Sequence, residues 1–211
     1  MTLFLKAAAV VALSLTLGGC AILGALGGGG NKNRAQLYRF GGEAAVAGPT
    51  NASSRTVKLH SVSFDPAAEG DRILSITGAE AAYLSNSRWV APARDLFAEA
   101  AERAFDRAGV RLARRDQPFD AETSLVLEVP TFEARYENGP EAAPVVVVEV
   151  RAALVTGRSR QILGETSYTV RQPAAENRVT MIVQAFDQAS RQALDQTAAW
   201  AATTARAAPR T

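Results

Sequence analysis

Residues 146–154 read Val-Val-Val-Glu-Val-Arg-Ala-Ala-Leu. Alternate side chains of an extended strand point to opposite faces. Val148 and Val150 therefore share an apolar face, whereas Glu149 and Arg151 lie together on the other face. This alternation predicts a strand with one face against a core and the other in water.

Two further strand patterns flank this stretch. Residues 125–136 alternate in hydropathy as far as Pro130, after which Phe132 begins a shifted apolar phase. Because proline has no N–H to donate, we expect a bulge or an edge position there. Residues 162–171 alternate again after a turn at 157–160. Three such strands in succession predict an antiparallel meander.

Two amphipathic helices accompany the strands. Residues 91–108 carry apolar side chains at helical spacing, and Gly109 is placed to end that helix in a left-handed conformation. A second apolar stripe of the same period predicts a helix over residues 177–205. Three earlier strands are predicted at residues 37–40, 56–64 and 72–77, and in the second of them Val62 and Phe64 shift the phase of the alternation.

The predicted order is therefore β-β-β-α-β-β-β-α. The simplest arrangement that buries all of these apolar faces is a two-layer α+β fold, a mainly antiparallel sheet with two helices packed on one face.

Composition excludes several classes of protein. The chain has 211 residues, is 47% hydrophobic and 21% charged, and carries 23 Lys and Arg against 21 Asp and Glu. These values are not those of a collagen-like, disordered or polytopic membrane chain. A net charge of +2 does not indicate a nucleic-acid partner. One Cys and one His exclude a Cys/His zinc site, and we expect no metal and no cofactor.

The N-terminus has the layout of a secretory signal. Lys6 precedes an apolar run from Ala7 to Leu17, which is too short for an ordinary membrane-spanning helix. The run ends in Gly18-Gly19-Cys20, and Cys20 is the only cysteine. Alternative interpretations are an ordinary signal peptide with a stray cysteine, or a buried apolar helix.

Residues 17–20 resemble the lipobox of bacterial lipoproteins. The resemblance implies cleavage between Gly19 and Cys20, a diacylglyceryl group on the Cys20 thiol and acylation of the new amino terminus. In these lipoproteins Asp after the cysteine favours the inner membrane, so Ala21 favours the outer membrane, facing the periplasm.

These patterns divide the chain into four segments. The predicted segments are a signal peptide at 1–19, a lipidated Cys20 with a Gly-rich tether at 20–36, one folded domain at 37–205 and a frayed tail at 206–211.

No catalytic constellation is evident. His60, the only imidazole, lies in a predicted strand beside two serines without a flanking catalytic motif. The run Gly27 to Gly30 lacks the following Lys-Ser/Thr of a phosphate loop. We therefore predict no catalytic residues and no enzymatic activity. We assign three carboxylates to a solvated face of the first helix: Glu99, Glu102 and Asp106. Three arginines after that helix are assigned to a solvated loop, a partner contact or lipid headgroups: Arg111, Arg114 and Arg115.

One motif lies at the start of the first helix. Arg88-Trp89 precedes Pro92, and proline is tolerated where a helix begins. Trp89 either packs into the core or, with Arg88 and Pro92, contacts a partner. With the lipobox and the short strand 37–40, this Arg-Trp-x-x-Pro motif resembles the auxiliary lipoprotein family of ABC-type transport systems.

The resemblance implies a non-enzymatic role at the outer membrane. Such a lipoprotein docks the MCE-domain substrate-binding subunit of an ABC transporter that moves lipids, chiefly phospholipids, between two membranes. Alternatives are an outer-membrane assembly lipoprotein, acting on barrels or lipopolysaccharide, and a periplasmic hydrolase that depends on His60. A homo-oligomer is compatible with each.

Overall fold

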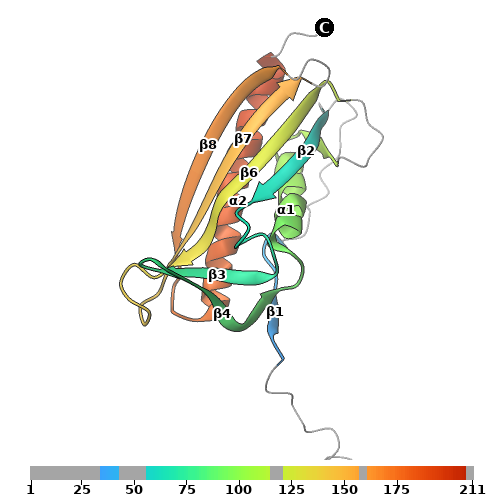
Figure 1. The fold of residues 1–211 in the computed structure, drawn as a ribbon. Helices are drawn as coiled ribbons and strands as arrows, with labels where there is room; N and C mark the ends of the chain where they lie inside the picture. Colours follow the sequence, from blue (N-terminus) through green and yellow to red (C-terminus); the bar gives the residue numbers. More distant parts are fainter. Residues whose placement is uncertain (1–33, 43–55, 115–120, 157–160, 208–211) are drawn as a thin grey trace, which may run out of the picture. The chain divides into compact units, whose positions relative to one another are not determined.

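A computed structural model describes residues 34–42, 56–114, 121–156 and 161–207 (Figure 1). All the elements belong to one compact unit, Ala35–Thr211. The strands are β1 (Gln36–Tyr38), β2 (Thr56–Phe64), β3 (Arg72–Thr77), β4 (Glu80–Trp89), β5 (Arg111–Ala113), β6 (Thr123–Arg135), β7 (Val145–Thr156) and β8 (Ile162–Pro173). The helices are α1 (Ala93–Arg107) and α2 (Val179–Ala207).

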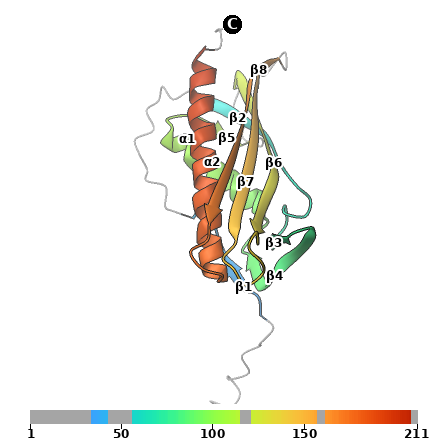
Figure 2. The same cartoon turned by 90° about the vertical axis from the view of Figure 1, so that its left-hand side faces the viewer.

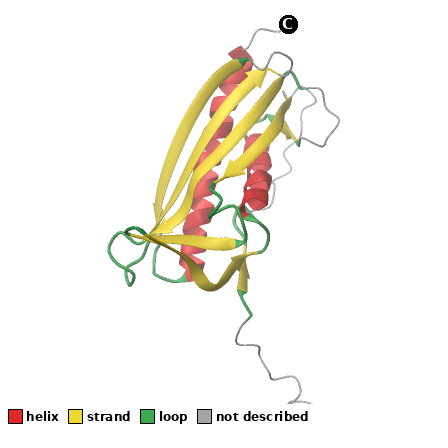
Figure 3. Cartoon of the chain, viewed as in Figure 1, coloured by secondary structure: helices red, strands yellow, loops and turns green. Residues whose placement is uncertain are grey.

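The predicted meander is present as β6, β7 and β8. β6 pairs antiparallel with β7, and β7 pairs antiparallel with β8 (Figure 3). Val148 lies opposite Phe132 on one side and Val170 on the other, and all three side chains are buried. This row faces the helices, while Glu149 and Arg151 lie on the opposite face, as the alternation predicts.

The expected bulge at Pro130 is confirmed, and it has a topological consequence. The register with β7 shifts between Glu128 and Thr131. Before the bulge the other edge of β6 pairs with β2, as far as Phe64 opposite Val129. After the bulge the same edge pairs with β3 at Ala134. The bulge thus marks the point where one long strand exchanges its neighbour.

The α+β class and the two-helix layer are confirmed, and both helices lie on one side of the sheet (Figure 2). The sheet is mixed, because parallel pairs accompany the antiparallel pairs β3–β4, β6–β7 and β7–β8. β6 runs parallel to β2 and to β3, β1 is parallel to β4, and β5 is parallel to β2. The connection from β2 to β6 passes through α1, and a crossover of this kind permits parallel neighbours.

β4 and β5 extend the predicted order, which contains six strands. β4 has a polar, Ala-rich sequence and includes Asn86 at φ 52°, so its side chains show no clear alternation. β5 comprises three residues directly after α1 and is shorter than a sequence pattern can reveal. β4 forms a tight hairpin with β3 and also pairs with the distant β1, whereas β5 pairs with β2, which lies before α1 in the sequence.

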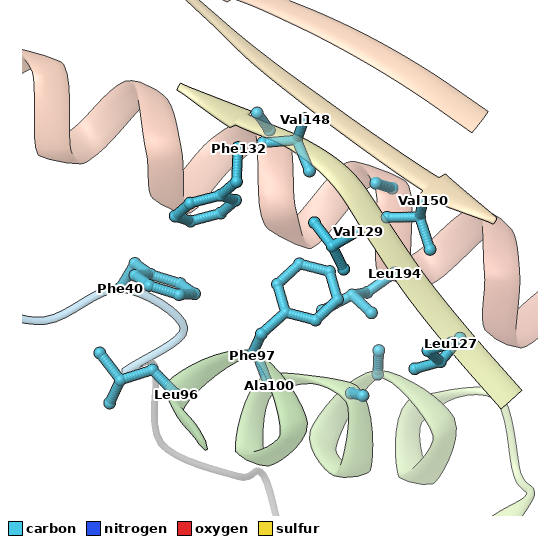
Figure 4. Close-up of a cluster of buried hydrophobic side chains, with 14 of the residues drawn as sticks. Phe40, Leu96, Phe97, Ala100, Leu127, Val129, Phe132, Val148, Val150 and Leu194 are labelled. Atoms are coloured by element: carbon cyan, nitrogen blue, oxygen red, sulfur yellow. The ribbon is translucent and has the colours of Figure 1, made fainter. Parts of the chain in front are cut away.

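Aromatic rings form the centre of the core. Phe132 lies 4.8 Å from Phe186 and 5.2 Å from Phe40, measured between ring centroids. Phe97 of α1 packs edge-on against the same ring. Figure 4 shows Phe40, Phe97 and Phe132 approaching one another from the N-terminal segment, α1 and β6. The core therefore joins the first described residues to both layers.

The segment after β1 is held between the two helices. Arg39 forms an ion pair with Glu99 of α1, and the Gly41 N–H donates to Oδ1 of Asp187 of α2 at 2.6 Å. α2 ends at Ala207, two residues beyond the helix predicted from the sequence. The predicted signal peptide, Cys20, most of the tether and the turn at 157–160 lie outside the described residues.

Candidate partner-binding surface

The Arg-Trp-x-x-Pro motif forms the junction between β4 and α1. Pro92 is the N-cap of α1 and offers no side-chain acceptor to the first turn. The turn between β2 and β3 bonds the first free N–H groups instead. The Ala93 N–H donates to the Gly70 carbonyl at 2.9 Å and the Arg94 N–H to the Glu69 carbonyl at 3.3 Å. The start of the helix is thus satisfied by backbone rather than by a capping side chain.

Trp89 belongs to the core. Its side chain is 2% exposed and packs edge-on against Phe40 at 4.9 Å and Phe186 at 5.3 Å. The backbone N–H of Trp89 donates to the Asp71 carbonyl at 2.7 Å. Of the two interpretations of this residue, packing into the core describes its position. Partner contact through Arg88 and Pro92 stays a prediction.

The surface next to Trp89 is partly apolar. Leu37 is 54% exposed and Val90 is 48% exposed, two of the three large hydrophobic side chains exposed among the described residues. Leu37 lies opposite Arg88 in the β1–β4 pairing, and the Val90 N–H donates to the Tyr38 carbonyl at 2.8 Å. In a parallel pair these positions place Leu37, Arg88 and Val90 on one face.

Arg88 also lies on this surface, and Asp71 neutralises its charge. Its Nη1 atom donates to both carboxylate oxygens of Asp71, at 2.8 and 3.0 Å, and both side chains are about half exposed. We refer to Leu37, Asp71, Arg88 and Val90 together as the β1–β4 corner. Sequence reasoning identified Arg88 but missed Leu37 and Val90. β1, which contains Leu37, has three residues, and β4, which precedes Val90, shows no clear alternation, so neither pattern indicates which side chains are exposed.

A second surface feature is a groove of about 490 Å³ between β2 and α1. His60 lies on its β2 side, at a register shift between Leu59 and Ser61 that leaves His60 out of the ladder. The phase shift expected within this strand is therefore present. The remaining lining residues are Leu59, Ser61, Val62, Arg94, Asp95, Ala98, Glu99, Glu102 and Arg114.

The groove brings His60 near two carboxylates noted in the sequence, but the acids are paired with arginines. Glu99 is bonded to Arg39, and Glu102 is bonded to Arg114. In the described part of the chain no hydrogen bond joins His60 to a hydroxyl or a carboxylate, which is the bond that a Ser-His-Asp relay needs.

Two of the three arginines that follow α1 lie among the described residues. Arg114 lies in the groove against α1, whereas Arg111 begins β5 and Arg115 falls outside the described residues. Asp106 is exposed on α1 and does not line the groove. Over the described ranges, no group of three or more His, Cys, Asp or Glu side chains is arranged to hold a metal ion.

Comparison with known families places this fold among known proteins. The model of the ABC-type transport auxiliary lipoprotein component matches residues 38–198. The chain belongs to this family. In this auxiliary lipoprotein the match includes every helix and strand except the start of β1 and the end of α2.

Solved structures share the fold of the auxiliary lipoprotein. Protein XCC0632 from Xanthomonas campestris superposes with a TM-score of 0.66 at 22% identity, covering 81% of this chain and 97% of that one. An uncharacterised protein gives a TM-score of 0.60 at 14% identity and covers 78% of this chain and 97% of its own. No curated protein gives a significant match. Neither α1 nor α2 is long and apolar enough to cross a membrane.

Proposed function

We propose that this chain is the lipid-anchored docking component of an ABC transporter that moves lipids, chiefly phospholipids, between the inner and outer membranes. Cys20 carries the anchor, the folded domain faces the periplasm from the outer membrane, and the partner is the MCE-domain substrate-binding subunit. The observation that carries the proposal is the family match over residues 38–198.

The chemistry of the domain supports a docking role. The carboxylates of the β2–α1 groove are engaged with arginines, and the core is filled by aromatic and aliphatic side chains. A rigid domain of this kind presents surfaces to a partner instead of a reacting group.

The β1–β4 corner is the surface that we assign to the transporter partner. Interface centres are rich in large apolar side chains and arginine. The corner combines Leu37 and Val90 with Arg88, whose charge is already matched by Asp71. Binding there buries apolar area without stranding an unpaired charge.

The position of the corner in the chain also fits this role. Leu37 follows Cys20 by 37 − 20 = 17 residues. A chain of that length spans at most about 60 Å when fully extended. The corner must therefore lie within that distance of the acylated residue, where a partner that reaches the membrane is accessible.

Site-specific crosslinking in the native membrane tests the proposal. A photoreactive residue at position 37 or 90 should capture an MCE-domain protein, identified by mass spectrometry. Leu37→Asp and Val90→Asp should each reduce capture by about tenfold, as expected for loss of an apolar contact of one to two kcal/mol. Thermal unfolding should be unchanged, since both side chains are half exposed.

Ile162→Asp is the matched control, because Ile162 is 58% exposed but lies at the opposite end of the sheet. It should leave capture intact. Capture of barrel-assembly or lipopolysaccharide-export proteins instead would support the alternative function, and an unmodified Cys20 thiol in the mass of the native protein would contradict the anchor.

A further inference from the structure

β8 is an edge strand of twelve residues. It pairs with β7, and no other described strand pairs with it. In an antiparallel strand every second residue points both its N–H and its C=O toward the same neighbouring strand, and the residues between them point these groups the other way. The half of β8 that does not bond to β7 therefore presents a row of N–H and C=O groups along its outer edge, visible as the free margin of the sheet in Figure 1.

The middle of this edge lacks the usual protection against strand addition. Natural edges are commonly guarded by Lys, Pro, a bulge or an inward-pointing charge. In β8 the only proline is Pro173, at the last position, and the register shift with β7 falls at the other end, next to Leu163. Between these ends the two charged residues are Glu165 and Arg171, and both are exposed on the solvent face.

The order of these charges is self-complementary. Consider two copies of one strand that pair antiparallel about a twofold axis normal to the sheet. The residue numbers of each opposed pair then add up to the same total. This total is even, because opposed residues lie on the same face and only every second residue of a strand lies on that face. With Tyr168 on the axis, Glu165 lies opposite Arg171 of the other copy, because 165 + 171 = 2 × 168. Shifting the register by one step to either side of this axis separates the two charges.

We propose that β8 is a homodimerisation edge, on which a second copy of this chain adds its own β8 antiparallel, with Tyr168 at the twofold axis. Two symmetry-related Glu165–Arg171 pairs then bridge the junction, and Ser167 lies opposite Thr169. The axis keeps both helical layers on the same side, so the two sheets continue into one.

This inference is independent of the proposed function. It depends on the edge of β8, whereas transporter docking is assigned to the β1–β4 corner at the other end of the sheet. A copy bound at β8 leaves Leu37 and Val90 uncovered on each protomer, so failure of either proposal leaves the other intact.

Charge exchange provides the test. Full-length lipidated protein in detergent should sediment as a dimer, and native mass spectrometry should give twice the chain mass. Glu165→Arg and Arg171→Glu each place like charges opposite one another and should each weaken the dimer by about tenfold or more. The double variant restores opposite charges and should dimerise like the wild type.

Mixing the two single variants gives a second prediction. A Glu165→Arg chain opposite an Arg171→Glu chain has both charge pairs restored, so the mixture should form a heterodimer that neither variant forms with itself. Because Arg171 also bonds to Glu137 within its own chain, Glu137→Gln is the control for loss of that internal pair and should dimerise normally.

Crosslinking locates the axis. Tyr168→Cys should join two copies through a short bis-maleimide, whereas Thr180→Cys, an exposed position on α2, should not. A wild-type protein that is monomeric at micromolar concentration would overturn the proposal. So would a larger assembly that is insensitive to both charge reversals, or a β8 edge that crosslinks only to a different protein.

Discussion

Gly41 is the residue at which a single methyl group should be most informative. Its backbone has φ +67°, a conformation that side-chain-bearing residues rarely adopt. A Cβ built there lies 2.7 Å from the Cβ of Ala100 on α1. Because the Gly41 N–H is also bonded to Asp187, the segment has little freedom to move away from the helix.

Two costs follow for Gly41→Ala. The left-handed conformation costs an alanine about 1–2 kcal/mol. Forcing a methyl group into the packed contact with Ala100 adds about 1–3 kcal/mol. The variant should therefore lose about 2–5 kcal/mol of unfolding free energy, a large part of the 5–15 kcal/mol typical of a domain.

Urea unfolding followed by circular dichroism measures the loss, and Gly109→Ala separates its two parts. Gly109 has φ +71° but nothing within 4 Å of its Cβ position, so this variant has only the conformational cost. Adding Ala100→Gly to Gly41→Ala should recover the packing part, apart from about 1 kcal/mol for glycine in a helix. Equal losses for Gly41→Ala and Gly109→Ala would refute the close contact.

Two further predictions concern the core and its margin. Phe132→Ala removes a ring that contacts five other aromatic side chains and should lower the free energy of unfolding by about 3–5 kcal/mol. Phe132→Leu should lower it by less. A urea midpoint that the alanine variant leaves unchanged would contradict this packing. Burial raises the pKa of Tyr136, whose O–H donates to Asn177 Oδ1 at 3.0 Å, so the unfolded chain loses this proton first. The contribution of Tyr136 to stability is then complete below about pH 10 and is lost as the pH rises above that value. Tyr136→Phe should flatten the decline of unfolding free energy above about pH 10 and remove a phenol that ionises above its ordinary range in an absorbance titration, whereas an unchanged titration curve would count against the burial.

Features with a local cause were predictable. The alternation in β7 indicates which face meets the helices, and Pro130 predicts the bulge in β6 because proline cannot donate to a ladder. The periodic stripe of α1 predicts its extent to within two residues at each end. The shifted phase near His60 likewise indicates the irregularity in β2.

The candidate docking surface was only partly predictable. Arg88 was selected from its motif, but its neighbours on the corner come from separate strands. Leu37 is brought beside it by the parallel pairing of β1 with β4, which no periodicity reports. Trp89 shows the same limit, since a tryptophan before a helix is compatible with core and surface alike until Phe40 and Phe186 are placed around it.

Sequence periodicity alone determined the type of both helices and of every long strand except β4, and the face that each buries, because these properties depend on residues close together in the chain. Outside the predicted meander of β6, β7 and β8, only the tertiary structure decided which strands are neighbours, including the exchange of β2 for β3 along β6 after its bulge. It also decided that β8 has a free edge and that Gly41 lies against α1. These features depend on contacts between residues far apart in the chain, and such contacts become determinate only when the whole core is packed at once.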